Sequence, residues 1–192
     1  MLRTIGIVIA MVVAISASPA LADTQSHVPP IKRALPEIMA KIVDADLINA
    51  LRASNAQRRG MTQADIDALE ATWQREIDES SRPLIDSVVE NSLATRMRKV
   101  IENSGIVITE IGVIDAKGLS IAQSAPNSDI WQGEEVKFTK TFDVGPDAVF
   151  IDEVEFDSST QSMQSQANFT VKDPDTGMPI GAVTVGINVD AL

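Results

Sequence analysis

The spacing of hydrophobic residues changes once along this chain, near Ile106. Before that residue, apolar side chains recur every three or four positions, as they do on one face of a helix. After it, they gather in short runs rich in β-branched residues, and turn sequences separate these runs. The sequence therefore predicts a helical half followed by a sheet half, which is an α+β architecture. A length of 192 residues suits one such domain.

The helical half contains three segments with helical spacing. The first is expected over residues 36–57. The second follows Thr62 and Asp65, which form the pattern of a capping box. The third begins at Pro83, either as a separate helix or as the kinked continuation of a longer one, and ends before Gly105.

The sheet half contains five runs with strand character and one interruption. Because the connections are short, neighbouring strands are expected to be antiparallel, with the helices packed on one face of a five-stranded sheet. A short helix is expected in the interruption, over residues 126–142. The five strands are predicted at 106–115, 119–124, 148–157, 162–172 and 180–189.

The first 22 residues have the pattern of a secretory signal peptide. Arg3 precedes an apolar run over residues 5–15, and the small residues of Ala20-Leu21-Ala22 follow. The apolar run is shorter than the roughly 20 residues that span a bilayer, so a retained anchor is the less favoured alternative. We expect cleavage between Ala22 and Asp23 and a periplasmic or extracellular protein.

The mature chain is expected to form one domain. Residues 23–35 contain His27 and two adjacent prolines, a composition that predicts a short extended linker. Residues 36–192 would then form the domain, with a helical lead over 36–104 and a sheet core over 105–192.

Composition excludes several classes of function. The net charge of −11 argues against nucleic acid as a partner. The chain has no cysteine and a single histidine, His27, which is placed in the expected linker. A serine-histidine triad, a zinc site and histidine-ligated haem are therefore not expected in the domain. We predict no catalytic residue, no metal and no cofactor.

Two segments carry a resemblance to a known family. Residues 174–190, PDTGMPIGAVTVGINVD, are a turn followed by an apolar strand with regularly placed glycines, and residues 129–135, DIWQGEE, lie between the second and third strands. This arrangement resembles the Cache, or PDC, group of extracytoplasmic sensor domains, whose core is PAS-like. The resemblance covers about residues 84–192. It implies a non-catalytic domain that binds a small polar molecule and acts through a separate membrane-bound signalling partner.

Three candidate ligand-binding residues lie in the insert. Trp131 would form a flat wall of the ligand pocket, and Asp129 or Gln132 would orient a polar group of the ligand. The alternative is that Trp131 fills the core and Asp129 only caps a helix.

Three more candidates lie on strands. Phe150 and Asp152 share the more apolar face of the third strand, which is expected to face the insert. Asp152 would then bind a ligand donor. Alternatively it lies at the margin of the strand, in water or paired with a lysine such as Lys137 or Lys140. On the fourth strand Phe169 is a further candidate wall of the pocket.

A second function remains open at this stage. The apolar face of the first helix is widened by Leu47, Ile48 and Leu51, and the helical half is longer than the family's lead helix. A structural or interaction protein of the cell envelope, which forms a homodimer or docks through these helices, is therefore the alternative.

Overall fold

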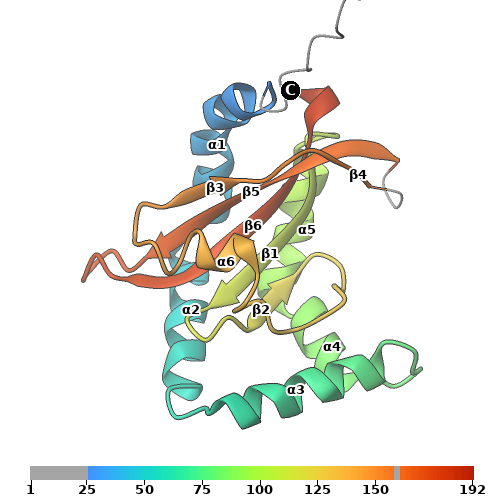
Figure 1. The fold of residues 1–192 in the computed structure, drawn as a ribbon, viewed down its shortest axis with the longest axis vertical. Helices are drawn as coiled ribbons and strands as arrows, with labels where there is room; N and C mark the ends of the chain where they lie inside the picture. Colours follow the sequence, from blue (N-terminus) through green and yellow to red (C-terminus); the bar gives the residue numbers. More distant parts are fainter. Residues whose placement is uncertain (1–25, 158–160) are drawn as a thin grey trace, which may run out of the picture.

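The computed structural model describes residues 26–157 and 161–192 of the protein. The expected signal peptide and its cleavage point lie outside the described residues. Six helices and six strands are described, and they confirm the α+β class (Figure 1). Their bounds are α1 Val28–Ile42, α2 Ala45–Gln57, α3 Gln63–Glu76, α4 Pro83–Val89, α5 Ser92–Asn103, β1 Ile108–Asp115, β2 Ser120–Gln123, α6 Val136–Thr139, β3 Val149–Ile151, β4 Glu155–Asp157, β5 Ser162–Lys172 and β6 Pro179–Asn188. None of the described helices is long and apolar enough to cross a membrane.

The first predicted helix is two helices, and it begins earlier than expected. The prediction of an extended linker over residues 23–35 is wrong from Val28 onward, because the two prolines occupy the first turn of α1, where no backbone N–H is required. Asp44 separates α1 from α2. Its side chain accepts a hydrogen bond from the backbone N–H of Leu47 at 2.9 Å and so caps the start of α2.

The capping box before α3 is confirmed. The Thr62 side chain accepts from the backbone N–H of Asp65, and the Asp65 carboxylate accepts from the backbone N–H of Thr62. Pro83 is the first residue of a separate helix, α4, rather than a kink. Asn91 then ends the α4 region and caps α5, because its side chain accepts from the backbone N–H of Ala94.

The sheet has six antiparallel strands instead of the predicted five. The spatial order is β2-β1-β6-β5-β3, and β4 also pairs with β5. The predicted third strand divides into β3 and β4 because the backbone leaves the ladder after the N–H of Asp152, which still donates to the Gln166 carbonyl at 2.8 Å. The carbonyl of Asp152 instead accepts hydrogen bonds from His27 Nε2 at 2.9 Å and from Ser165 Oγ at 2.8 Å. His27 is therefore a buried contact between the start of α1 and the sheet.

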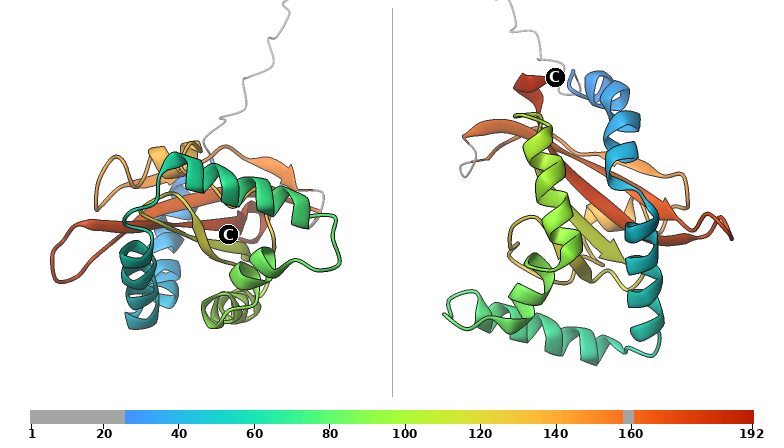
Figure 2. Two further views of the ribbon diagram at one scale, coloured as in Figure 1. Left: turned by 90° about the horizontal axis from the view of Figure 1, so that it is seen from below. Right: turned by 180° about the vertical axis from the view of Figure 1, so that it is seen from behind.

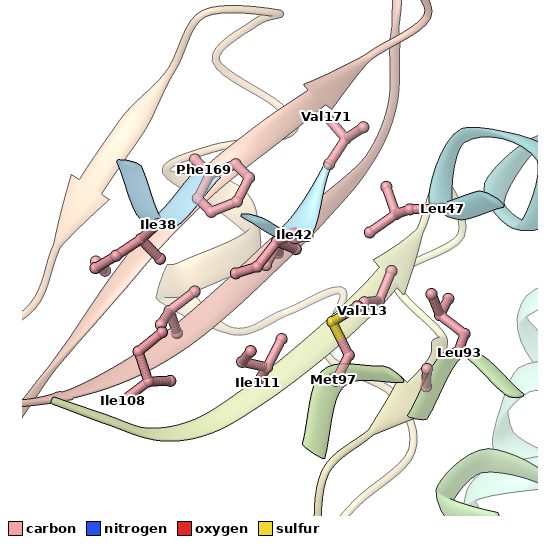
Figure 3. Packing of buried hydrophobic residues seen from close by; sticks show 14 of the residues in the cluster. Ile38, Ile42, Leu47, Leu93, Met97, Ile108, Ile111, Val113, Phe169 and Val171 are labelled. Atoms are coloured by element: carbon pink, nitrogen blue, oxygen red, sulfur yellow. The ribbon is translucent and has the colours of Figure 1, made fainter. Parts of the chain in front are cut away.

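One face of the sheet carries the main hydrophobic core. Helices α1, α2 and α5 cover this face, whereas α6 lies on the opposite side, as the edge-on view shows (Figure 2). The strands contribute alternate residues, among them Phe169, Val183 and Val185, and α1 contributes Ile38 and Ile42 (Figure 3). This alternation leaves the intervening residues of β5 and β6 on the face under α6.

A second hydrophobic cluster joins α3 and α4 to the β1–β2 hairpin and the insert. Trp73, which is fully buried, and Ile66 come from α3, whereas Leu119 and Ile130 come from the hairpin and the insert. No residue of α3 belongs to the main core cluster. The long helical half therefore builds two separate layers, and α3 crosses one end of the sheet (Figure 1).

Arg52 of α2 and Arg58, directly after α2, form buried or partly buried ion pairs with two turns of the sheet. Asp115, at the end of β1, is fully buried and accepts from Arg58 Nη1 at 2.7 Å and from Ser54 Oγ at 2.6 Å. Asp173, at the β5–β6 turn, accepts two hydrogen bonds from Arg52, each of 2.7 Å. This bidentate contact fixes the position of the β5–β6 turn against α2.

The Arg52–Asp173 contact predicts a pH-dependent stability. Hydrogen bonds from Arg52 lower the pKa of Asp173 from its ordinary value of 3.8 to about 2. A carboxyl group with a lowered pKa in the folded state stabilises the protein above the unfolded-state pKa, and this contribution is lost as pH falls from about 4 to about 2. In urea unfolding, the difference in free energy of unfolding between wild type and Arg52→Met should shrink over that interval.

A matched control is Lys172→Met, which removes an exposed ion pair to Asp147. Because both side chains of this pair are exposed, the free energy of unfolding of this variant should stay close to that of wild type. If Arg52→Met shows a constant difference, Arg52 does not set the titration of Asp173.

Candidate functional site

The face of the sheet under α6 is unusually polar for a covered surface. Gln166 and Asn168 of β5 point to this face, because they alternate with core residues, and Thr184 of β6 lies opposite Asn168 in the ladder. Helix α6 covers part of this face with Phe138, which packs on Ile114 and Ala182 and stacks on Phe142.

Several oxygen atoms on this side are buried without a partner. Within the described residues, five buried side-chain atoms make no hydrogen bond, and four of them are oxygens of the insert or of the α6-facing positions of β5 and β6. These four are Gln132 Oε1, Asn168 Oδ1, Thr170 Oγ1 and Thr184 Oγ1. Burying a polar group without a hydrogen bond costs free energy, so such a concentration marks a surface suited to an additional polar partner.

A hollow lies at the edge of α6 on the same face. Its inner part has a volume of about 20 Å³ and includes Gln132, Lys137, Gln166 and Thr184 among its lining residues. Its outer part, of about 170 Å³, shares the first three of these residues and adds Asp129. The inner part has room for about one water molecule, so a larger group of a ligand would occupy the outer part.

Charged groups of both signs line this hollow. Glu110 accepts a hydrogen bond from Gln166 Nε2 at 2.8 Å, and Asp129 and Glu135 add two further carboxylates. The only ammonium group among the lining residues belongs to Lys137, and no described carboxylate forms an ion pair with it. The hollow can therefore offer both acceptors and a cationic donor to one small molecule.

The structure brings together two of the three insert candidates. Gln132 donates from Nε2 to Oδ1 and to the carbonyl of Asp129, and both residues line the outer hollow. Because Nε2 is used in this contact, Oε1 of Gln132 is left as an acceptor on the inner side. Whether either residue binds a ligand stays a prediction.

Trp131 lies in a different place from its two neighbours. Its indole packs with the second hydrophobic cluster and donates from Nε1 to the carbonyl of Lys117 at 3.1 Å, and it lines neither part of the hollow. Gly118 and Gly133 leave room for this arrangement, since a side chain at Gly133 would meet the indole. The structure thus places Trp131 as a support of the insert.

Phe150 and Asp152 lie at the margin of the α6 face. Phe150 is opposite Asn168 in the ladder, and the ammonium of Lys140 lies 5.7 Å from its ring centroid, so Phe150 faces the insert as expected. The Asp152 carboxylate accepts from the backbone N–H of Glu153 at 2.9 Å, and the residue is partly exposed. Neither residue lines the hollow.

Phe169 points to the opposite face of the sheet. Its ring lies in the main core beside Ile38 and Ile42, and only 1% of the residue is exposed (Figure 3). Part of the residue lines a separate cavity of about 370 Å³ between α1 and the segment before β3. Phe169 is therefore separated from the hollow by the sheet itself.

Sequence reasoning missed most of the polar lining. The missed residues include Glu110, Ser120, Gln123, Lys137, Gln166 and Thr184. A usable signal was present in β5, where glutamine and asparagine alternate with apolar residues on a strand that has neighbours on both sides. A polar face of this kind lies either in water or under a covering element, so it is a candidate for polar recognition.

A larger cavity, of about 540 Å³, lies at the other end of the molecule near His27. Its lining is mostly exposed, as with Glu153, Met163 and Asp190, and contains none of the buried unpartnered oxygens. Within the described residues, no group of three or more His, Cys, Asp or Glu side chains is arranged to hold a metal ion. The hollow beside α6 is therefore the better candidate for specific recognition.

Comparison with known proteins returns structures but no sequence relatives. No family model and no curated protein matches the chain. Among solved structures, the sensor domain of the Vibrio cholerae histidine kinase DctB is 16% identical, with a TM-score of 0.46, over 89% of this chain and 54% of that chain. The ligand-binding domain of the Campylobacter jejuni chemoreceptor Tlp3 with L-norvaline is 11% identical, with a TM-score of 0.39, over 90% and 63%.

A further structure is the ligand-binding domain of the Pseudomonas aeruginosa chemoreceptor PctC with GABA, which is 11% identical, with a TM-score of 0.40, over 81% of this chain and 60% of that chain. The chain thus spans between half and two thirds of the length of these sensor domains. All three are named as sensor or ligand-binding domains, and the Cache/PDC character of this chain stays a resemblance. The ligands named are those of the other proteins.

The unpartnered hydroxyl of Thr184 predicts an unusual mutational effect. Thr184→Val keeps the shape of the side chain and removes a buried oxygen that has no partner, so we expect the free energy of unfolding to rise by about 1 kcal/mol. Thr141→Val is the matched control, because the buried Thr141 Oγ1 donates to the carbonyl of Lys137 at 2.6 Å. That variant should lose about 1 kcal/mol in urea unfolding. Equal losses in both variants would contradict the assignment of Thr184 as unpartnered.

Proposed function

We propose that this protein is an exported, non-catalytic sensor-type domain that binds a small polar molecule in the hollow beside α6. The observation that carries the proposal is the set of buried oxygens without partners, above all Gln132 Oε1 and Thr184 Oγ1 in the inner hollow. A ligand that hydrogen-bonds to these atoms replaces an unfavourable state of the free protein with a satisfied one.

The lining defines the chemistry of the ligand. Gln132 Oε1 can only accept, so the ligand must present an N–H or O–H donor to it. Lys137 can only donate and has no carboxylate partner among the described residues, so the ligand must also present an acceptor, most favourably a carboxylate. Small amino acids, hydroxy acids and amines with a polar group satisfy one or both requirements.

The proposed place of action is outside the cytoplasm. It is supported by the signal-peptide pattern of residues 1–22. In this proposal the ligand changes the position of the insert, and a separate membrane-bound partner reads that change. No catalytic step is proposed. No histidine lines the hollow, and Ser128 Oγ, which donates to Asp129 Oδ2 at 2.9 Å, lies at an exposed position.

The alternative function is a structural protein that associates through its first helices. It depended on an apolar helix face that would be exposed for a partner. Leu47, Ile48 and Leu51 of α2 widen the apolar face in the sequence, yet all three are buried in the main core of the same chain. The extra helices α3 and α4 likewise bury their apolar residues in the second cluster. A homodimer would therefore have to use other surfaces.

Thermal unfolding with a ligand panel tests the proposal. Amino acids, organic acids, amines and purines should be screened against the purified protein, and a ligand at one hundred times its dissociation constant should stabilise by about 2.7 kcal/mol. For a carboxylate ligand that responds, Lys137→Met should raise the dissociation constant at least about tenfold, because it removes a charge-assisted hydrogen bond.

Lys140→Met is the control, since Lys140 lies over the Phe150 ring and lines neither part of the hollow. Its ligand response should equal that of wild type. Absence of any response across the panel, or equal losses in the two lysine variants, would count against binding in this hollow.

A further inference from the structure

Helix α3 holds the segment that carries the ligand-binding candidates. The helix crosses one end of the sheet, next to the connection that follows β2 (Figures 1 and 2). Three of its side chains form hydrogen bonds to backbone groups of residues 127–131. The same stretch contains Asp129 and is followed directly by Gln132, both of which line the hollow.

Glu70 makes the central contact of this set. Its Oε2 accepts from the backbone N–H of Ile130 and from that of Trp131, each at 3.1 Å. Two consecutive amide groups directed at one carboxylate oxygen fix the orientation of the peptide between them. That peptide lies between Asp129 and Gln132, so it sets the direction in which both side chains leave the backbone.

Two neighbouring side chains hold the start of the same segment through its carbonyl groups. Trp73 Nε1 donates to the carbonyl of Asn127 at 3.0 Å, and Gln74 Nε2 donates to the carbonyl of Ser128 at 2.6 Å. From its other side the segment is bound by the β1–β2 hairpin. There, the Ser120 N–H donates to the Ile130 carbonyl at 2.9 Å.

These hydrogen bonds connect α3 directly to the segment that carries the ligand-binding candidates. Helix α3 belongs to the second hydrophobic cluster and shares no residue with the main core, so it packs against α4, the insert and the β1–β2 hairpin and not against the central strands. A displacement of α3 is therefore transmitted to residues 127–131, and a displacement of those residues by a ligand is transmitted to α3.

We propose that α3 positions the binding hollow and that Glu70 is its positioning residue. This inference rests on the proposed function, because it assigns the control of that same site to α3. Glu70 does not touch the ligand. It acts by holding the peptide that directs Asp129 and Gln132, and ligand binding in turn shifts α3, whose outer face is exposed to a partner.

Nuclear magnetic resonance without ligand tests the positioning directly. In Glu70→Ala, the amides of Ile130 and Trp131 should exchange at least tenfold faster with solvent, and the side-chain amide resonances of Gln132 should shift. Glu70→Gln keeps an acceptor oxygen and should restore most of the wild-type signals. Exchange in the β5–β6 ladder should stay unchanged, which separates positioning from a general loss of stability.

Asp67→Ala is the matched control, because Asp67 is an exposed carboxylate of the same helix whose side chain accepts a hydrogen bond from Gln63 at 2.9 Å. It should leave the Gln132 resonances unmoved. If Glu70→Ala fails to fold, Gln74→Ala at an exposed position should produce a smaller shift in the same direction. Unmoved Gln132 resonances in both α3 variants would overturn the proposal.

A ligand titration separates this inference from the proposed function. For a ligand found in the panel, Glu70→Ala should raise the dissociation constant at least tenfold and Asp67→Ala should not. Ligand binding to wild type should also change the tryptophan fluorescence, because Trp73 and Trp131 are the only tryptophans and both adjoin this segment. If wild type binds no member of the panel, the proposed function fails, whereas the Gln132 resonances still decide whether α3 positions the segment.

Discussion

Strands β5 and β6 have one apolar face, which packs in the main core, and one polar face under α6. The rest of the structure depends on this difference between the two faces. Successive side chains on a strand point to opposite faces, so one register places Phe169 and Val183 in the apolar core and Asn168 and Thr184 under α6. A shift by one residue would exchange the two sets and bury the polar side chains among the helices. The apolar face therefore fixes which polar groups face the insert.

The helical half secures that register at the turns. Arg52 of α2 and Arg58, the residue directly after α2, contact Asp173 and Asp115. Asp115 is the last residue of β1, and Asp173 directly follows β5. Each contact is local, yet together they align α2 with both the β5–β6 turn and the β1–β2 hairpin. Since the hairpin also donates to the insert at the Ile130 carbonyl, the position of α2 bears indirectly on the hollow.

Elements with strong local signals could be predicted from the sequence, whereas the site could be predicted only in part. The capping box at Thr62 and the run that forms β5 depend on nearby residues, and both are confirmed. The break at Asp152 depends on His27, which is 125 residues away, so no local pattern could reveal it. Trp131 was predicted to bind the ligand because tryptophan is rare in this chain. Its surroundings, however, are formed by Gly118 and by α3 residues that are distant in the sequence.

The polar lining shows why a binding surface is harder to read than a core. A core residue is recognised by its own chemistry, because burial of an apolar side chain is favourable wherever it occurs. A glutamine or threonine on a strand predicts solvent exposure unless the covering element is known, and here that element is the insert with its four-residue helix. Gln132 and Thr184 are therefore informative only in combination: each is buried, each retains an oxygen without a partner, and the fold directs both to one small hollow. In the proposed function, a small polar ligand supplies the hydrogen bonds that these two oxygens lack within the described residues.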